Sequence, residues 1–298
     1  MDRFLATELP RLRDALAAEF FKVSRRRMTY ICIAVFTFLV LLFYTVLWLR
    51  LRDGPGDTQG TFATWLTARS AMSFRNVVPY SFALERFFAT LVCVVFAGTM
   101  MGNEYDWRTV GVVTSRGVRR WHFLFAKSVV CVGFTIITLF VGFLAAMATS
   151  AWFTNLYGLP WGTFDFFRAA DAFLSLFRTT LVVLPFVFLA LLFGTVWRSG
   201  GQAVGAAAGV FFIEQIFVGL MSQARGWVKD VPDFFFSVNI DAVMRANGTF
   251  ARQEGGGLPF ALTPGGPPEW RGALVLTAWM LAFAVLVFWR FQRRDIQE

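Results

Sequence analysis

The sequence predicts an all-α polytopic membrane protein, and two observations carry this prediction. First, 57% of the 298 residues are hydrophobic and only 16% are charged, whereas soluble globular domains carry about 25% charged residues. Second, six apolar runs each approach the ~20 residues that a helix needs to cross a bilayer. We therefore expect one transmembrane domain over residues 1–298, with six transmembrane helices at 28–48, 83–101, 123–147, 179–197, 202–221 and 273–289.

Residues 1–27 predict an amphipathic helix ahead of the first span. Apolar residues recur three and four positions apart and so share one helix face; they are Leu5, Leu9, Leu12, Leu16, Phe20 and Val23. An interfacial helix on the cytoplasmic membrane surface is the favoured interpretation, because the basic run Arg25–Arg27 leads directly into the first span. The alternative is an ordinary soluble helix packed on a partner.

The basic residues report membrane topology. The formal net charge is +9, but in a polytopic protein Lys and Arg gather near the cytoplasmic ends of the spans, so we predict no nucleic-acid partner. Sixteen of the 28 Lys and Arg residues fall on one side if both termini are cytoplasmic, and they lie on short segments close to span ends. This topology makes 102–122 a cytoplasmic link and 222–271 an extracytoplasmic loop.

Motifs for catalysis are missing from the sequence. It contains no G-x-x-x-x-G-K-[ST] phosphate loop, so the chain is not expected to hydrolyse ATP or to act as an enzyme. Its cysteines lie in apolar runs and are predicted to be buried small hydrophobes, and the one histidine is predicted at the membrane surface; they are Cys32, Cys93, Cys131 and His122. We therefore assign no catalytic residue, no metal site and no cofactor to this chain.

Glu214 is an ionisable residue inside the fifth predicted span. Placing a carboxylate there costs at least a few kcal/mol unless it is paired, protonated or hydrated. It is a candidate translocation-path residue, and a structural hydrogen bond to a neighbouring span is the equally weighted alternative. Glu85 and Arg86, at the outer end of the second span, are interpreted as interfacial anchors.

Three glycines at four-residue spacing open the same fifth span: Gly201, Gly205 and Gly209. Glycines four apart share one helix face and let another backbone approach closely. The pattern predicts a helix-packing face, and Glu214 lies about 140° away from it around the helix axis.

The link at 102–122 is longer than the two to eight residues that usually join neighbouring helices. It is charged and aromatic, and Tyr105–Thr114 is predicted to form a short helix on the membrane surface. Aromatic residues are favoured at protein interfaces, so a docking element is preferred over a solvated basic loop. The candidate coupling residues are Glu104, Tyr105, Asp106, Trp107, Arg108, Thr109 and Arg116.

These residues resemble the ABC-2 family of ABC transporter permeases. The family pattern after the second span is Gly-x-Glu-aromatic-x-x-Gly-Thr, then a Ser/Ala-Arg turn, an Arg-Trp pair and a Lys that opens the third span. It is matched here by Gly102, Glu104, Tyr105, Thr109, Arg116, Arg120, Trp121 and Lys127, with Arg108 in place of the second glycine. Two further resemblances lie before the first span, at 19–27, and after the sixth, at 293–296.

The resemblance implies a type V exporter-like permease fold with six spans and a coupling helix after the second. Two such subunits, as a homodimer or a heterodimer, would pair with two separate ATPase subunits that bind ATP and Mg²⁺, in the cell membrane of a prokaryote. The implied function is export of an amphipathic or hydrophobic substrate such as a peptide, a drug or a lipid. An ion channel or passive pore is the alternative, and a lipid-directed enzyme is a third possibility for which no catalytic cluster is found.

Overall fold

The computed structural model describes residues 2–52, 54, 65, 68–107, 119–159, 161–162, 166–221, 231–247 and 266–293, and the side chains from residue 12 onward. The described residues form helices and no strand. They are α1 (Asp2–Arg25), α2 (Arg27–Arg52), the 3-10 turn η1 (Phe74–Asn76), α4 (Val77–Asp106), α6 (Arg120–Leu156), α7 (Phe166–Trp197), α8 (Gly200–Met221), α9 (Phe236–Arg245) and α10 (Glu269–Arg293).

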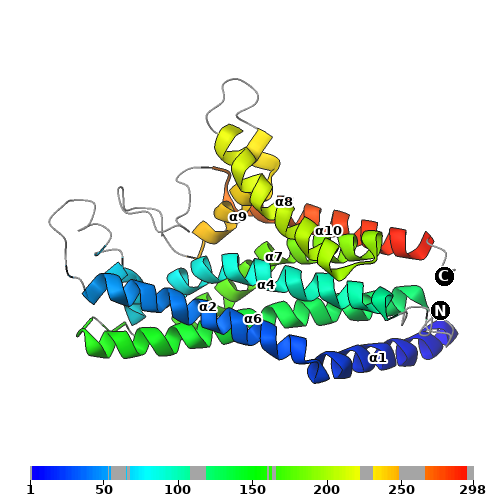
Figure 1. The fold of residues 1–298 in the computed structure, drawn as a ribbon, viewed down its shortest axis with the longest axis horizontal. Helices are drawn as coiled ribbons and strands as arrows, with labels where there is room; N and C mark the ends of the chain where they lie inside the picture. Colours follow the sequence, from blue (N-terminus) through cyan, green and yellow to red (C-terminus); the bar gives the residue numbers. More distant parts are fainter. Residues whose placement is uncertain are drawn as a thin grey trace.

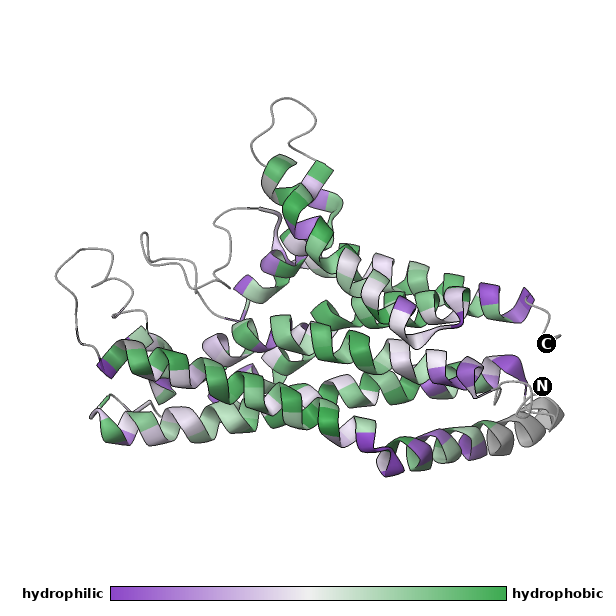
Figure 2. Ribbon diagram, viewed as in Figure 1, coloured by the Kyte–Doolittle hydropathy of each residue, from purple (hydrophilic) through white to green (hydrophobic). Residues whose placement is uncertain are grey.

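Six of the described helices are long and apolar enough to cross a membrane, as predicted: α2, α4, α6, α7, α8 and α10. Several exceed the predicted spans. At ~1.5 Å rise per residue the 37-residue α6 is about 55 Å long, well beyond the ~30 Å of a hydrocarbon core. The longest helices therefore project out of the apolar layer, and Figure 2 shows hydrophobic residues along their middles and hydrophilic residues gathered at one end.

The bundle is built around α4 and α7. The span windows of these two helices are 67% and 72% buried, whereas those of α2, α8 and α10 are between 17% and 28% buried. In Figure 1, α2, α4 and α6 run along the long axis, and α8 and α10 lie on one side of them with α9. α2, α8 and α10 thus carry most of the surface available to lipid.

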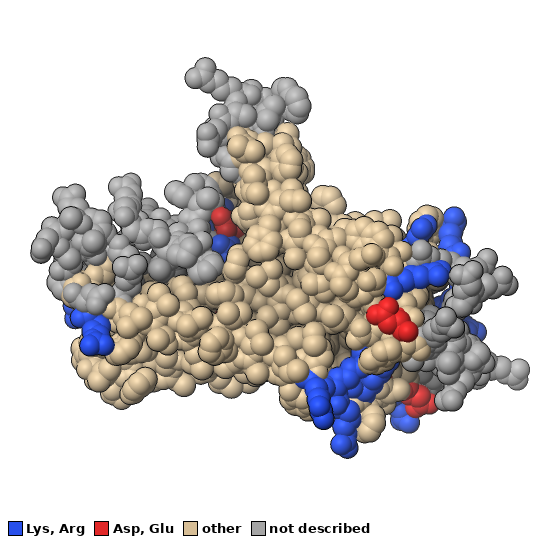
Figure 3. Space-filling view, viewed as in Figure 1, with Lys and Arg blue, Asp and Glu red and all other residues tan. Residues whose placement is uncertain are grey.

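Both chain termini lie at the same end of the bundle (Figure 1), which we call the terminal end. α4 finishes there at Asp106 and α6 begins there at Arg120. Lys and Arg side chains gather at this end in Figure 3, while the middle of the face shown is almost free of charge. A chain whose two termini lie on the same side of a membrane must cross it an even number of times, which agrees with six spans.

α1 is a continuous helix, as predicted for residues 1–27, and it packs along the first half of α6 (Figure 1). Among its described side chains, at 12–25, Glu19 and Val23 are buried, whereas Phe20 of the predicted apolar face is 65% exposed.

Close helix packing occurs at glycines other than the three predicted. A Cβ at Gly201, Gly205 or Gly209 would meet no heavy atom within 4 Å, so this face packs no other described part of the chain. Close approach occurs instead at Gly102 of α4, where a Cβ would lie 2.1 Å from the backbone nitrogen of Gly200. Within the described part of this chain, the glycine face of α8 is therefore uncovered, and its role as a helix-packing face stays a prediction.

We expect Gly102→Ala to destabilise the protein, because the added methyl group overlaps the backbone at the start of α8. Overpacking of this kind costs about 1–3 kcal/mol. The matched control is Gly205→Ala, which places a methyl group in open space and replaces glycine by the better helix former. Thermal unfolding of the purified proteins in detergent checks this; equal melting temperatures for the two variants would contradict it.

Candidate functional site

Five charged side chains from separate parts of the chain meet near the terminal end, and we call them the buried ion cluster: Glu19, Lys22, Arg26, Glu104 and Lys127. Lys127 Nζ lies 3.1 Å from Glu19 Oε2 and 3.2 Å from Glu104 Oε1. Arg26 Nη2 lies 3.3 Å from Glu104 Oε1. Lys22 contacts Glu104 and lies 3.4 Å from Glu19.

The centre of this cluster is shut off from solvent. The side chains of Glu104 and Lys127 are 0% exposed and that of Glu19 is 8% exposed, whereas Lys22 and Arg26 reach the surface in part. Buried charges are tolerated only when their partners compensate them. Three cations here face two carboxylates, so the cluster is nearly neutral and ties α1, α4 and α6 together.

Arg26 is the one-residue break between α1 and α2, which we call the α1–α2 corner, and its side chain joins the cluster. The last carbonyl groups of a helix lack intrahelical partners. Here Thr29 Oγ1 donates a 2.7 Å hydrogen bond to the Val23 carbonyl, and the Tyr30 hydroxyl donates one of 2.8 Å to the Ser24 carbonyl. These two hydrogen bonds satisfy carbonyl groups in the last turn of α1, and the helix is interrupted at Arg26.

The end of α4 is exposed immediately beyond the cluster. Trp107 closes the helix, its backbone N–H donating to the Asn103 carbonyl, and its side chain is 60% exposed. The Arg26 guanidinium lies 5.1 Å from the centre of the Trp107 ring, a cation–π contact that steadies the indole without covering it. Asp106 is exposed beside it. We call Asp106 and Trp107 the α4 tip.

A second contact reaches the α4 tip region from the α7–α8 turn. Arg198 has φ 57°, the left-handed conformation that ends many helices, and its N–H donates to the Gly194 carbonyl. This conformation places its guanidinium 6.0 Å from the ring centre of Tyr105. The side chain of Tyr105, which is half-buried, thus contacts the turn that leads into α8.

The predicted coupling residues therefore divide into four groups, one of which is the half-buried Tyr105. Glu104 is buried inside the bundle and has no surface to offer a partner, while Asp106 and Trp107 are exposed. Tyr105 and Asp106 end α4 and do not begin a separate surface helix, which corrects that part of the predicted Tyr105–Thr114 helix. Arg108, Thr109 and Arg116 lie outside the described residues.

Sequence reasoning missed Glu19, Lys22 and Lys127 as members of one site. One signal was present, because Lys127 is an ionisable residue within the predicted span at 123–147, and such residues demand a partner. Its partners could not be identified, since they lie 23 and 108 positions away in the chain.

Glu214 lies at the opposite side of α8 from the glycine face and is 8% exposed. Its Oε1 accepts a 2.8 Å hydrogen bond from the backbone N–H of Ser237, in the first turn of α9. The start of a helix has unpaired N–H groups and a partial positive charge, so a carboxylate stabilises it. This contact supports the structural alternative for Glu214, an anchor for α9.

Glu85 and Arg86 are not interfacial anchors, contrary to the sequence interpretation. Arg86 pairs with Asp241 of α9 at 2.6 Å, with both side chains largely buried. Glu85 is 0% exposed, and its carboxyl group packs against Gly142 of α6 beside Phe36. The error arose because both residues were placed at the outer end of a span, whereas α4 extends further to Val77.

The sequence predicted an interfacial histidine and three buried cysteines. His122, in the first turn of α6, is 0% exposed, and its ring centre lies 4.0 Å from that of Trp121. The three cysteines are buried with free thiols, which confirms that prediction. Among the described residues no three His, Cys, Asp or Glu side chains come together in a geometry that could hold a metal ion.

Removing one member of the buried ion cluster should be costly. We expect Glu104→Ala to destabilise the protein by about 3–5 kcal/mol, because three cations would lose a fully buried carboxylate. The matched control is Glu269→Ala, which removes an acid paired with Arg178 at 3.1 Å but 47% exposed, and should cost less than about 1 kcal/mol. Thermal unfolding in detergent compares them; a Glu104→Ala protein as stable as the control would contradict a compensating role.

Comparison with known protein families shows which family the chain belongs to. No curated protein matches it. Residues 59–297 match a family described as a protein of unknown function (DUF2705), a match that covers α4 through α10 and most of the sequence. The chain therefore belongs to the DUF2705 family.

Proposed function

We propose that this chain is the membrane-embedded subunit of an ATP-driven transporter whose ATPase is a separate polypeptide. The observation that carries the proposal is the α4 tip. An exposed tryptophan ends a central helix, while the residues directly behind it are clamped to α1 and α6 by buried ion pairs. Rigidly presented aromatic side chains are typical anchors of protein interfaces.

The buried ion cluster connects the α4 tip to the neighbouring helices. Glu104 stands one helical turn from Trp107 and is paired with Lys127 of α6 and with Arg26 at the α1–α2 corner. A partner that displaces the α4 tip must therefore move these elements with it or break buried ion pairs. At Gly102 the same end of α4 touches the start of α8. A partner protein bound at the α4 tip could thus displace α1, α2, α6 and α8 together with α4.

The resemblance to ABC-2 permeases fits this arrangement and supplies its details. In this proposal the terminal end faces the cytoplasm, which agrees with the Lys and Arg residues gathered there (Figure 3). ATP and Mg²⁺ bind to the partner ATPase, a second permease subunit completes the route, and an amphipathic or hydrophobic substrate is exported across a prokaryotic cell membrane.

An ion channel or passive pore is the alternative, and it would use Glu214 as a lining residue. The geometry gives it less support, because the Glu214 carboxylate is buried and holds the first turn of α9. A pore would also leave the exposed α4 tip without a purpose.

The orientation can be tested by cysteine labelling. The native cysteines are buried, so an introduced thiol is the reactive one. We expect the Asp106→Cys protein in intact cells to react with a membrane-impermeant maleimide only after permeabilisation, because its site faces the cytoplasm. The Trp152→Cys protein, at a position 65% exposed near the other end of α6, should react in intact cells. The reverse pattern would refute the proposed topology.

The docking role is tested by Trp107→Ala. Loss of an interface anchor costs about 2 kcal/mol of binding free energy, roughly 30-fold in Kd. We expect the binding of the purified chain to its phosphate-loop ATPase partner to weaken by this factor, with a matching loss of stimulated ATP turnover. Trp152→Ala, which truncates an equally exposed tryptophan far from the tip, is the matched control and should bind normally.

Two results would overturn the docking role. One is a Trp107→Ala protein that binds and stimulates the ATPase as the parent does. The other is full transport by the purified chain alone in vesicles without nucleotide.

A further inference from the structure

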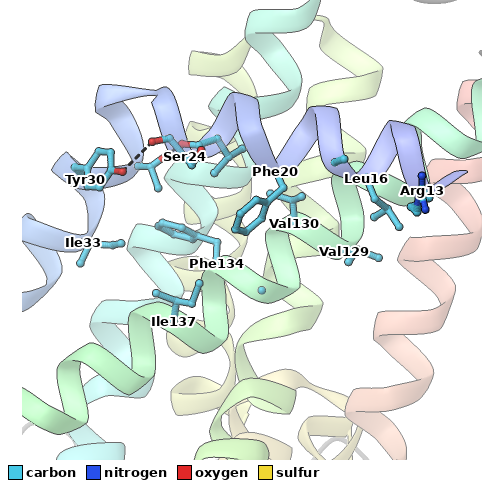
Figure 4. Close-up of a pocket in the computed structure, with 14 residues that line it drawn as sticks. Arg13, Leu16, Phe20, Ser24, Tyr30, Ile33, Val129, Val130, Phe134 and Ile137 are labelled. Carbon is cyan, nitrogen blue, oxygen red and sulfur yellow. Dashed lines mark hydrogen bonds between the residues drawn. The ribbon is translucent and has the colours of Figure 1, made fainter. Parts of the chain in front are cut away.

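An apolar groove of about 640 Å³ lies between α1, the start of α2 and α6 (Figure 4). Phe20 of α1 and Val129 and Ile137 of α6 line it and are 40–65% exposed. Its volume falls within the ~300–1,000 Å³ of small-molecule sites. The α6 wall belongs to a helix that is apolar enough to span the membrane, so the groove opens toward lipid.

The polar groups of the groove are already bonded, except at one end. The hydroxyl groups of Ser24, Thr29 and Tyr30 each donate to a backbone carbonyl of α1. They therefore leave the interior apolar, and it suits a hydrocarbon occupant. Arg13 lines the other end of the groove, where its side chain is 87% exposed and 4.0 Å from Asp14.

The one charged residue among the described residues that line the groove is basic. Arg13 is exposed at one end of it, and the exposed acid among the described side chains of α1 is Asp14. Basic residues near a membrane surface attract anionic lipids by about 1 kcal/mol each. An apolar interior with a guanidinium group at one end is complementary to a hydrocarbon chain that carries an anionic headgroup.

We propose that this groove binds one anionic phospholipid, with an acyl chain between α1 and α6 and the headgroup near Arg13. The site is independent of the proposed transport function, since it uses neither the buried ion cluster nor the α4 tip. An occupied groove would add apolar contact between α1 and α6 beyond the ion pairs of Glu19 and Lys127.

A filling variant tests the site directly. Gly133 lines the groove, and a Cβ there would meet no heavy atom within 4 Å, so Gly133→Leu occupies the groove without a clash of its first side-chain atom. Gly205→Leu makes the same change on α8, where a Cβ also meets nothing, and is the matched control. Circular dichroism and thermal unfolding establish that both variants fold.

The probe is phosphatidylglycerol with a photoactivatable diazirine on one acyl chain, in phosphatidylcholine vesicles that contain the full chain. We expect cross-links in the parent protein to concentrate on peptides from 13–33 and 129–137. They should fall about tenfold in Gly133→Leu, the factor for displacing about two methylene groups, and stay unchanged in Gly205→Leu. A phosphatidylcholine probe of the same chain, and an Arg13→Gln protein with the first probe, should both give weaker labelling.

Three outcomes would overturn the proposal. Even labelling of all lipid-facing helices, unaffected by Gly133→Leu, would mean ordinary annular lipid. Equal labelling by the two probes would remove the anionic headgroup from the assignment. An absence of lipid adducts from 13–33 and 129–137 in the parent protein would show that the groove does not hold this occupant.

Discussion

The fully buried pair of Glu104 and Lys127 is the constraint on which the rest of the terminal end depends. A charge with no solvent contact must be matched where it stands, and one carboxylate cannot be balanced by a cation elsewhere on the surface. The pair therefore fixes the depth and rotation of α4 against α6. Glu19 then adds α1, and Arg26 adds the corner that leads to α2. Apolar packing alone, which is alike in protein and in lipid, gives far weaker control over such registers.

Specific contacts of the same kind recur away from this end. Arg86 and Asp241 pin α9 to α4, and Glu214 holds the first turn of α9 from α8. α9 also packs Phe236 against Phe186 and Trp279, with ring centres 4.9 and 5.3 Å apart. Polar contacts thus select the arrangement, and aromatic packing fills it.

Sequence patterns predicted the spans well because membrane insertion depends on the local sum of hydropathy, which a window of residues contains. They failed where the answer depended on distant neighbours. The spacing of Gly201, Gly205 and Gly209 describes a face, but only the fold shows that Gly102 and Gly200 meet instead. For the candidate site, Glu104 stood out by its place in a charged link. Its burial was not predictable, because the partners come from other helices.

The ion cluster also has a consequence for biosynthesis. Residues 19–26 leave the ribosome long before residues 104 and 127, so during synthesis Lys22 and Arg26 lack Glu104, and Glu19 lacks Lys127. At that stage Lys22 and Arg26 are free to act as topogenic signals for α2. Only when the third span has been inserted can Lys127 and Glu104 draw α1 against the bundle. If the terminal end faces the cytoplasm as proposed, the same charges serve twice, first in orienting a nascent helix and later in holding α1 against the bundle.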